Sequence, residues 1–321
     1  MRRNSVAETN QGSEAASSKE GASKLQYAHP VLGIALCLCS LFFFACLDTT
    51  TKYLAATYNV PLIVAIRYIV NFALMVVILA PRHGPALIRT ERTGLVWVRT
   101  ACLASASLFV GLALKRMPVA ETTAMIYLAP MLIVLLAKPL LGEQIGRLGW
   151  LAAVTGFVGV LLVSRPGTNL DTLGIVFALC AACVNAAYQL LSRVLARTEQ
   201  TIALLFYTAL GGSILFGMGL PWFSEGVAPS NLQIMLFLSL GASGGLGHYF
   251  LTASYRYAPA SLLAPVSYMQ LLWAGFLGWI VFGHLPDGLT IAGMLIIMAA
   301  GVMIAFKSRG TLARQIARRQ P

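Results

Sequence analysis

Long apolar segments alternate with short polar breaks along almost the whole chain. After residue 30 there are ten such segments, and each is close to the length of about 20 residues that a membrane-crossing helix needs. They are residues 31–53, 60–80, 94–114, 119–141, 147–164, 172–193, 201–221, 231–254, 260–283 and 288–306. Strands of a membrane barrel would instead alternate apolar and polar positions. The pattern therefore predicts an all-α polytopic membrane protein with ten transmembrane helices.

The breaks between the segments are too short to hold a domain outside the membrane. Residues 1–30 are rich in Ser, Ala, Glu, Gln and Gly, which predicts a disordered tail. No small-residue cleavage site follows the apolar run that begins at Val31, so we expect that run to stay as the first span. Residues 307–321 are expected to form a second, basic tail.

The distribution of positive charge predicts the orientation. The chain has 321 residues, of which 58% are hydrophobic and 11% charged. With the amino terminus in the cytoplasm, sixteen of the 23 Lys and Arg residues face the cytoplasm, four face outward and three lie within spans. This is a positive-inside bias, and it places both termini in the cytoplasm. The net charge of +12 is then explained by anionic membrane lipid and needs no nucleic acid.

The three positive residues within spans differ in depth. Arg99 and Lys138 lie near the cytoplasmic ends of their spans, and we expect them to extend their charges to the interface. Arg67 lies seven residues from the outer end of its span, roughly 10 Å deep.

The two halves of the chain echo one another. A shift of 141 residues places "LKRMPVAETTAMIY" (114–127) on "YRYAPASLLAPVSY" (255–268), so that Tyr127 matches Tyr268. A similar shift places "CLD" (46–48) on "CVN" (183–185). Halves of five spans each, 31–164 and 172–306, must enter the membrane in opposite directions. Secondary transporters have such inverted repeats, with the solute site near the membrane midplane between them.

Asp48, Lys52 and Arg67 are the first candidates for that site. Asp48 and Lys52 share one helix face, and Asp48 reaches a depth comparable to that of Arg67. A charge inside the membrane costs about 3 kcal/mol or more and normally faces the protein interior or a wet cavity. We expect the three residues to form an ionic network on the wall of a solute cavity. The alternative is that Lys52 ends its helix and reaches the interface together with Asp48.

The second half supplies polar counterparts. Asn185 and Gln189 lie four residues apart on one helix face, with Tyr188 beside them. They are candidates for solute contact, and the alternative is hydrogen bonding between helices. Tyr127 and Tyr268 carry rings with a polar end, which suit a flat or zwitterionic solute, although either is equally consistent with ordinary packing.

Four more side chains complete the set of candidates. Gln270 and Trp273 follow Tyr268 closely. His248 belongs to "GASGGLGHY" (241–249), a glycine-rich stretch that should let helices approach closely, and it is a candidate for solute binding or for packing. Glu121 lies near the outer end of the fourth span and is a candidate for ion coupling.

Several stretches resemble the drug/metabolite transporter superfamily, and specifically its ten-helix permeases of the EamA type. The resemblance lies in "DTTTKYL" (48–54), in "AIRY" (65–68), and in residues 112–143 and their repeat at 253–283. The chain departs from the pattern at His284, where such permeases often repeat the Gly-Glu of 142–143. The resemblance implies transport of small organic solutes. The segments around Asp48 and Arg67 are most similar to uptake carriers for S-adenosylmethionine and riboflavin, while exporters of amino acids and related metabolites share the same frame.

The sequence therefore favours a secondary transporter of a small organic metabolite in a bacterial cytoplasmic (inner) membrane, with the solute and membrane lipid as partners. No phosphate-binding loop, metal cluster or cofactor motif occurs in it. A membrane enzyme acting on lipid or isoprenoid would show clustered acidic, His or Arg residues at a membrane face. A channel would show a ring of like residues from an oligomer.

Overall fold

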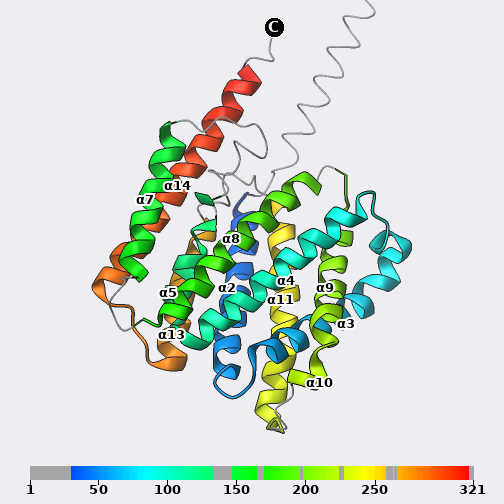
Figure 1. Ribbon diagram of the computed structural model, residues 1–321. Coiled ribbons are helices and arrows are strands. Elements are labelled where there is room, and N and C mark those ends of the chain that lie inside the picture. Colours follow the sequence, from blue (N-terminus) through cyan, green and yellow to red (C-terminus); the bar gives the residue numbers. More distant parts are fainter. Residues whose placement is uncertain are drawn as a thin grey trace, which may run out of the picture.

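The structure is a computed structural model that describes residues 30–129, 131–132, 147–164, 170–195, 198–223, 228–257, 263 and 266–317. Every regular element in these residues is a helix (Figure 1). Five of the described helices are long and apolar enough to cross a membrane. The all-α polytopic fold expected from the sequence is confirmed. Residues 1–29 of the tail predicted at 1–30, and Lys138, lie outside the described residues.

A described helix lies in each of the ten expected segments. The first half contains α2 (Pro30–Leu54), α3 (Val60–His83), α4 (Thr93–Arg116), α5 (Val119–Ile126) and α7 (Arg147–Ser164). The second half contains α8 (Thr172–Leu195), α9 (Thr201–Gly217), α11 (Asn231–Tyr257), α13 (Met269–Phe282) and α14 (Gly288–Ala317). Two short elements, η1 (Gly84–Leu87) and α10 (Leu220–Phe223), lie in the connections after α3 and α9.

The packing of the helices has the symmetry of the repeat. Each of the main packed pairs either joins two equivalent helices or has an equivalent pair in which the two halves swap roles. Helix α2 packs along α11, and its counterpart α8 packs along α4. Helices α3 and α9 form a pair of equivalent helices, as do α5 and α13, and α7 and α14. Figure 1 shows α7 and α14 side by side at one edge of the bundle. This exchange is the relation expected for a duplicated five-helix unit.

Three helix bounds differ from the expected spans. Helix α14 runs on to Ala317, so most of the expected basic tail continues the last helix. Helix α5 ends at Ile126, in the middle of an expected span. Helix α13 begins only at Met269, nine residues into its expected span of 260–283. The last two helices face each other, so the interruptions meet at the interface between the halves.

Small residues set the closest helix contacts. Gly159 of α7 and Gly293 of α14 face each other: a Cβ atom added to either would lie within 3 Å of the other's backbone oxygen. On α11, a Cβ at Gly241 would lie 2.8 Å from the backbone nitrogen of Asn71, and one at Gly247 would lie 2.7 Å from the Phe44 ring. The close approach predicted for the stretch 241–249 is thus confirmed at two of its glycines.

Adding a methyl group at Gly241 should destabilise the bundle. The new atom would press on the backbone of α3, which moves less easily than a side chain, so we expect Gly241→Ala to cost about 1–3 kcal/mol. Gly275→Ala is the matched control, because no atom lies within 4 Å of a Cβ at that helical glycine. Thermal unfolding of the two purified variants in detergent measures the difference. Equal stability would contradict the packing of α11 on α3.

Candidate functional site

A chain of hydrogen bonds joins the two halves inside the bundle. The Gln270 side chain of α13 donates from Nε2 to Asp48 Oδ2 of α2 at 3.4 Å. The Tyr127 hydroxyl at the end of α5 donates toward Gln270 Oε1, at 3.2 Å, and also to the Ser267 carbonyl. Asp48, Tyr127 and Gln270 are all half-buried. Three of the residues predicted from the sequence therefore form one polar group in an otherwise apolar bundle.

Tyr268 lies directly beside this group. Its ring and that of Tyr127 are 5.0 Å apart between centroids and tilted by 39°. The two tyrosines are equivalent in the duplicated sequence. Equivalent residues can touch only near the axis that relates the halves, so this contact marks the centre of the interface between them.

Both tyrosines lie where a helix is interrupted. Tyr127 caps the carboxyl end of α5, and Tyr268 precedes the first turn of α13. The sequence accounts for the first interruption, because Pro130 has no N–H with which to bond the carbonyl of Ile126. Interrupted helices at the interface of repeats are the usual walls of a transporter's solute site, since they leave backbone groups free to bind.

Asp48, Lys52 and Arg67, for which an ionic network was predicted, point to different partners. In the described part of the chain no ion pair joins any two of these residues. The Arg67 guanidinium instead lies over the ring of its neighbour Tyr68, at 5.3 Å. It is close enough to Asp48 and His248 to act on both electrostatically, without touching them as an ion pair.

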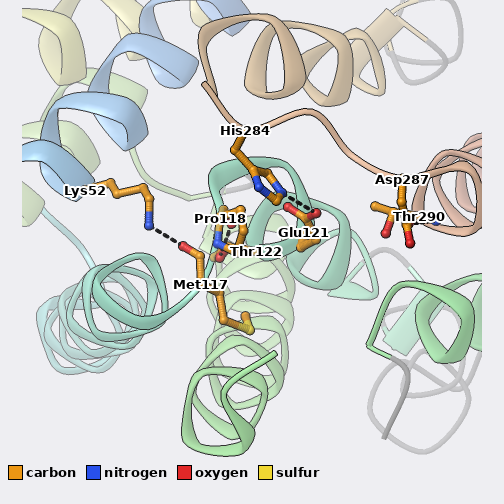
Figure 2. A network of polar contacts seen from close by, with 8 residues as sticks. All are labelled: Lys52, Met117, Pro118, Glu121, Thr122, His284, Asp287 and Thr290. Atoms are coloured by element: carbon orange, nitrogen blue, oxygen red, sulfur yellow. Dashed lines mark hydrogen bonds and ion pairs between the residues drawn. The ribbon is translucent and has the colours of Figure 1, made fainter. Parts of the chain in front are cut away.

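Lys52 supports the end of a neighbouring helix. Its Nζ donates to the carbonyl of Leu114 at 3.0 Å and to that of Met117 at 2.7 Å, at the carboxyl end of α4. Figure 2 shows the second of these hydrogen bonds. The same ammonium lies 5.4 Å from the centre of the Phe282 ring. A cation is favourable at a helix carboxyl terminus because the last carbonyls carry partial negative charge. Lys52 therefore neither pairs with Asp48 nor extends freely to the interface.

Glu121 joins the two halves at the same end of the bundle. It lies in the first turn of α5, and its Oε1 is 3.0 Å from His284 Nε2, in the segment between α13 and α14 (Figure 2). The Glu121 side chain is 5% exposed and that of His284 is 43% exposed. Glu121 Oε2 is buried and has no hydrogen-bond partner in the structure. His284, the position at which the sequence departs from the family pattern, thus binds a carboxylate of the opposite half.

Arg99 is buried within the bundle, against the expectation that it reaches the interface. It is 4% exposed and donates four hydrogen bonds to α8 and α9. The acceptors are Ser192 Oγ at 2.7 Å, Thr208 Oγ1 at 2.9 Å, the Tyr188 hydroxyl at 2.9 Å and the Leu204 carbonyl at 3.1 Å. All four acceptors are uncharged. These facing polar groups on α8 and α9 hold Arg99 inside the bundle.

The remaining candidates make no described contact with Asp48, Gln270 or Tyr127. Tyr188 holds Arg99, and its ring lies 4.6 Å from the guanidinium carbon. Asn185 and Gln189 are half-buried, and in the described residues neither amide makes a hydrogen bond. The His248 ring packs edge-on against Phe44 at 5.0 Å. The Trp273 ring packs edge-on against Phe42 at 5.0 Å, and Phe42 is exposed at the bundle surface.

Glu199 is a buried acid that the sequence did not single out. Its carboxylate accepts hydrogen bonds from the backbone N–H groups of Arg92, at 2.6 Å, and Glu91, at 3.0 Å, just before α4. Residues 89–91 and 198–200 line a cavity of about 230 Å³ around this contact. With Glu199 at its amino end and Lys52 at its carboxyl end, α4 has a compensating charge at each terminus.

The chain matches the EamA-like transporter family twice, over residues 31–165 and 172–306. The S-adenosylmethionine uptake transporter of Rickettsia felis is 25% identical, over 88% of this chain and 95% of that protein. The riboflavin transporter of Brucella anthropi is 26% identical, over 84% of this chain and 96% of that protein. The pseudopaline exporter of Pseudomonas aeruginosa is 26% identical, over 87% and 97%.

A solved crystal structure shares the fold. It superposes with a TM-score of 0.61 and covers 85% of this chain and 98% of the other, at 20% sequence identity. At that identity the likeness concerns the fold alone.

Proposed function

Because the chain belongs to the EamA-like transporter family, we propose that it is a secondary transporter whose solute binds between the two halves. The observation that carries this proposal is the polar chain Asp48–Gln270–Tyr127, which joins helices of both halves beside the paired rings of Tyr127 and Tyr268. Polar side chains inside a membrane bundle are costly and are normally retained for a solute or ion path. The rings suit a flat part of a solute, and Asp48 suits a donor or positive group.

Uptake of a metabolite such as S-adenosylmethionine or riboflavin is the transport that we favour. Two of the relatives named above carry these solutes. A relative that exports pseudopaline matches the chain over a similar length, so export of a related metabolite is the second candidate. The excess of Lys and Arg on one side supports cytoplasmic termini, and this orientation is part of the proposal.

Counterflow in proteoliposomes tests the proposal. Vesicles loaded with unlabelled S-adenosylmethionine or riboflavin should accumulate the labelled solute from outside, because a carrier exchanges one molecule for another. A membrane enzyme would convert the solute, and a channel would give no accumulation. A reagent that blocks the protein from one side of the vesicle inactivates one of its two orientations. The direction of transport by the remaining orientation then distinguishes uptake from export.

Glu121 is the group that we propose for ion coupling. It is buried, it has one oxygen without a partner, and its only described hydrogen bond crosses to His284 of the other half. Protonation would weaken this contact and let the halves move, so solute movement and proton movement would be linked.

Neutralising Glu121 should separate coupling from exchange. In Glu121→Gln vesicles we expect accumulation driven by a pH gradient to fall at least about tenfold, because the group can no longer release a proton. Counterflow, which needs no net proton movement, should stay within about twofold of wild type. Glu91→Gln, an exposed acid in the loop before α4, is the control. Loss of counterflow together with accumulation would assign Glu121 to structure.

A further inference from the structure

We propose that Arg67 and Asn71 form a subsite on α3 that binds a carboxylate group of the transported solute. This inference rests on the proposed transport function and specifies part of its solute. The subsite lies where α3 faces the glycine-rich stretch of α11. None of the observations above assigns a role to Asn71.

The two side chains lie on one face of α3 and face glycines of α11. Arg67 and Asn71 are four residues apart on α3, which packs on α11. A Cβ atom at Gly244 would lie 3.7 Å from Arg67 Nε, and one at Gly245 would lie 3.1 Å from Asn71 Oδ1. Both polar groups therefore lie against the glycine backbone of α11, and a side chain at Gly245 would press on Asn71 Oδ1.

Both groups have unused hydrogen-bonding capacity. No hydrogen bond or ion pair joins Arg67 to another residue in the part of the chain that the structure describes. Asn71 Oδ1 is buried and has no partner. An arginine has five N–H donors in a planar fork, and an unpartnered polar atom in the interior costs about 1–3 kcal/mol. A solute that supplies an anion to Arg67, and a donor to Asn71, would satisfy both.

The surrounding charge favours an anion. The guanidinium groups of Arg67 and Arg99 both act electrostatically on the half-buried His248, and Arg67 also acts on Asp48 without forming an ion pair with it. The hydrogen bonds of Arg99 go to uncharged groups, and the Asp48 carboxylate bonds to Gln270. Neither cation has a carboxylate contact in the described residues. A carboxylate fits the guanidinium fork with two parallel hydrogen bonds, and a donor beside it, such as an α-ammonium group, fits Asn71 Oδ1.

Two solutes that differ by one carboxylate provide the test. The probes are S-adenosylmethionine and its decarboxylated analogue, compared as competitors of counterflow in vesicles with wild-type protein, Arg67→Gln, Arg67→Lys or Arg82→Gln. Arg82 is exposed near the end of the same helix, so it controls for the loss of one charge. The folded fraction of each variant is measured by size-exclusion chromatography.

Wild-type protein should prefer the carboxylate form by about 10- to 100-fold, as for other hydrogen bonds between charged groups. Arg67→Gln should lose this preference by binding the carboxylate form more weakly while binding the analogue equally well. Arg67→Lys should keep part of it, because it keeps the charge without the fork. Equal weakening of both solutes by Arg67→Gln, or an unchanged preference, would overturn the subsite.

A failure of the transport proposal gives a different result. If wild-type vesicles exchange riboflavin, which has no carboxylate, and not S-adenosylmethionine, the subsite is overturned. If they exchange neither solute, both are excluded, and the subsite is then tested by comparing metabolites in cells that express wild-type protein or Arg67→Gln. Solutes whose cellular level depends on Arg67 should carry a carboxylate. If the solutes that depend on the wild-type protein lack one, or are moved equally by Arg67→Gln, the subsite is overturned.

Discussion

Replacing Arg99 with glutamine should abolish most of the folded protein. The shorter neutral side chain would remove most of the four hydrogen bonds that the guanidinium donates to α8 and α9. A hydrogen bond to a charged group contributes about 1.5–3 kcal/mol. Since Arg99 joins the first half to two helices of the second, the total should reach about 4 kcal/mol, a large part of the stability of an ordinary domain. We expect the amount of monodisperse protein extracted from membranes to fall at least tenfold.

Arg82→Gln is the matched control for Arg99→Gln, because it removes the same charge from an exposed position on α3. Fluorescence-detected size-exclusion chromatography on both variants, with thermal unfolding of what remains, gives the measurement. If Arg99→Gln unfolds within the error of wild type, the hydrogen bonds of Arg99 do not hold the halves together. In that case the guanidinium would serve transport alone.

Replacing Asp48 with asparagine should abolish transport and leave the fold intact. The two side chains have the same shape, and the asparagine carbonyl can still accept a hydrogen bond from Gln270. What disappears is the negative charge between the halves. We expect kcat/KM for the solute to fall about 100-fold, since a hydrogen bond between charged groups contributes about 1.5–3 kcal/mol.

Two other variants separate this effect from a general one. Asp171→Asn alters an exposed acid in the connection before α8 and should transport normally. Lys52→Gln should lower thermal stability by about 1 kcal/mol, through the loss of the α4 contacts, with little change in KM. An equal loss of transport in Lys52→Gln and Asp48→Asn would show that Lys52 also takes part in solute binding.

The fold was predictable from the sequence because the hydrophobic pattern and the internal repeat each extend over many residues. Ten apolar runs and a shift of 141 residues suffice to predict the helices and their division into two halves. The interruption of the fourth helix at Tyr127 was harder to see, because Pro130 alone does not say whether a helix bends or stops. The meeting of Tyr127 with Tyr268 then follows from the repeat, since the helices that carry them pack on each other.

The errors in the candidate site concern which charges meet. Asp48 and Arg67 lie at comparable depths, and Lys52 lies one turn beyond Asp48, but depth does not fix the direction in which a side chain points around its helix axis. Lys52 turns to the end of α4, and Arg67 turns to the glycines of α11. Arg99 lies near the cytoplasmic end of its expected span, and yet it is buried. Its burial depends on Ser192, Thr208 and Tyr188, which come from two distant segments and carry no sequence signal of a shared site.

The central claim, that the polar chain between the halves is the solute site, is tested most directly by equilibrium binding. A labelled solute that the wild-type protein exchanges in counterflow is titrated against purified wild-type protein and purified Asp48→Asn, at equal folded fractions. We predict that the substitution weakens binding about 100-fold, in step with the loss of transport. Unchanged affinity in a variant that no longer transports would contradict the claim, because Asp48 would then act in the movement of the halves and not in holding the solute.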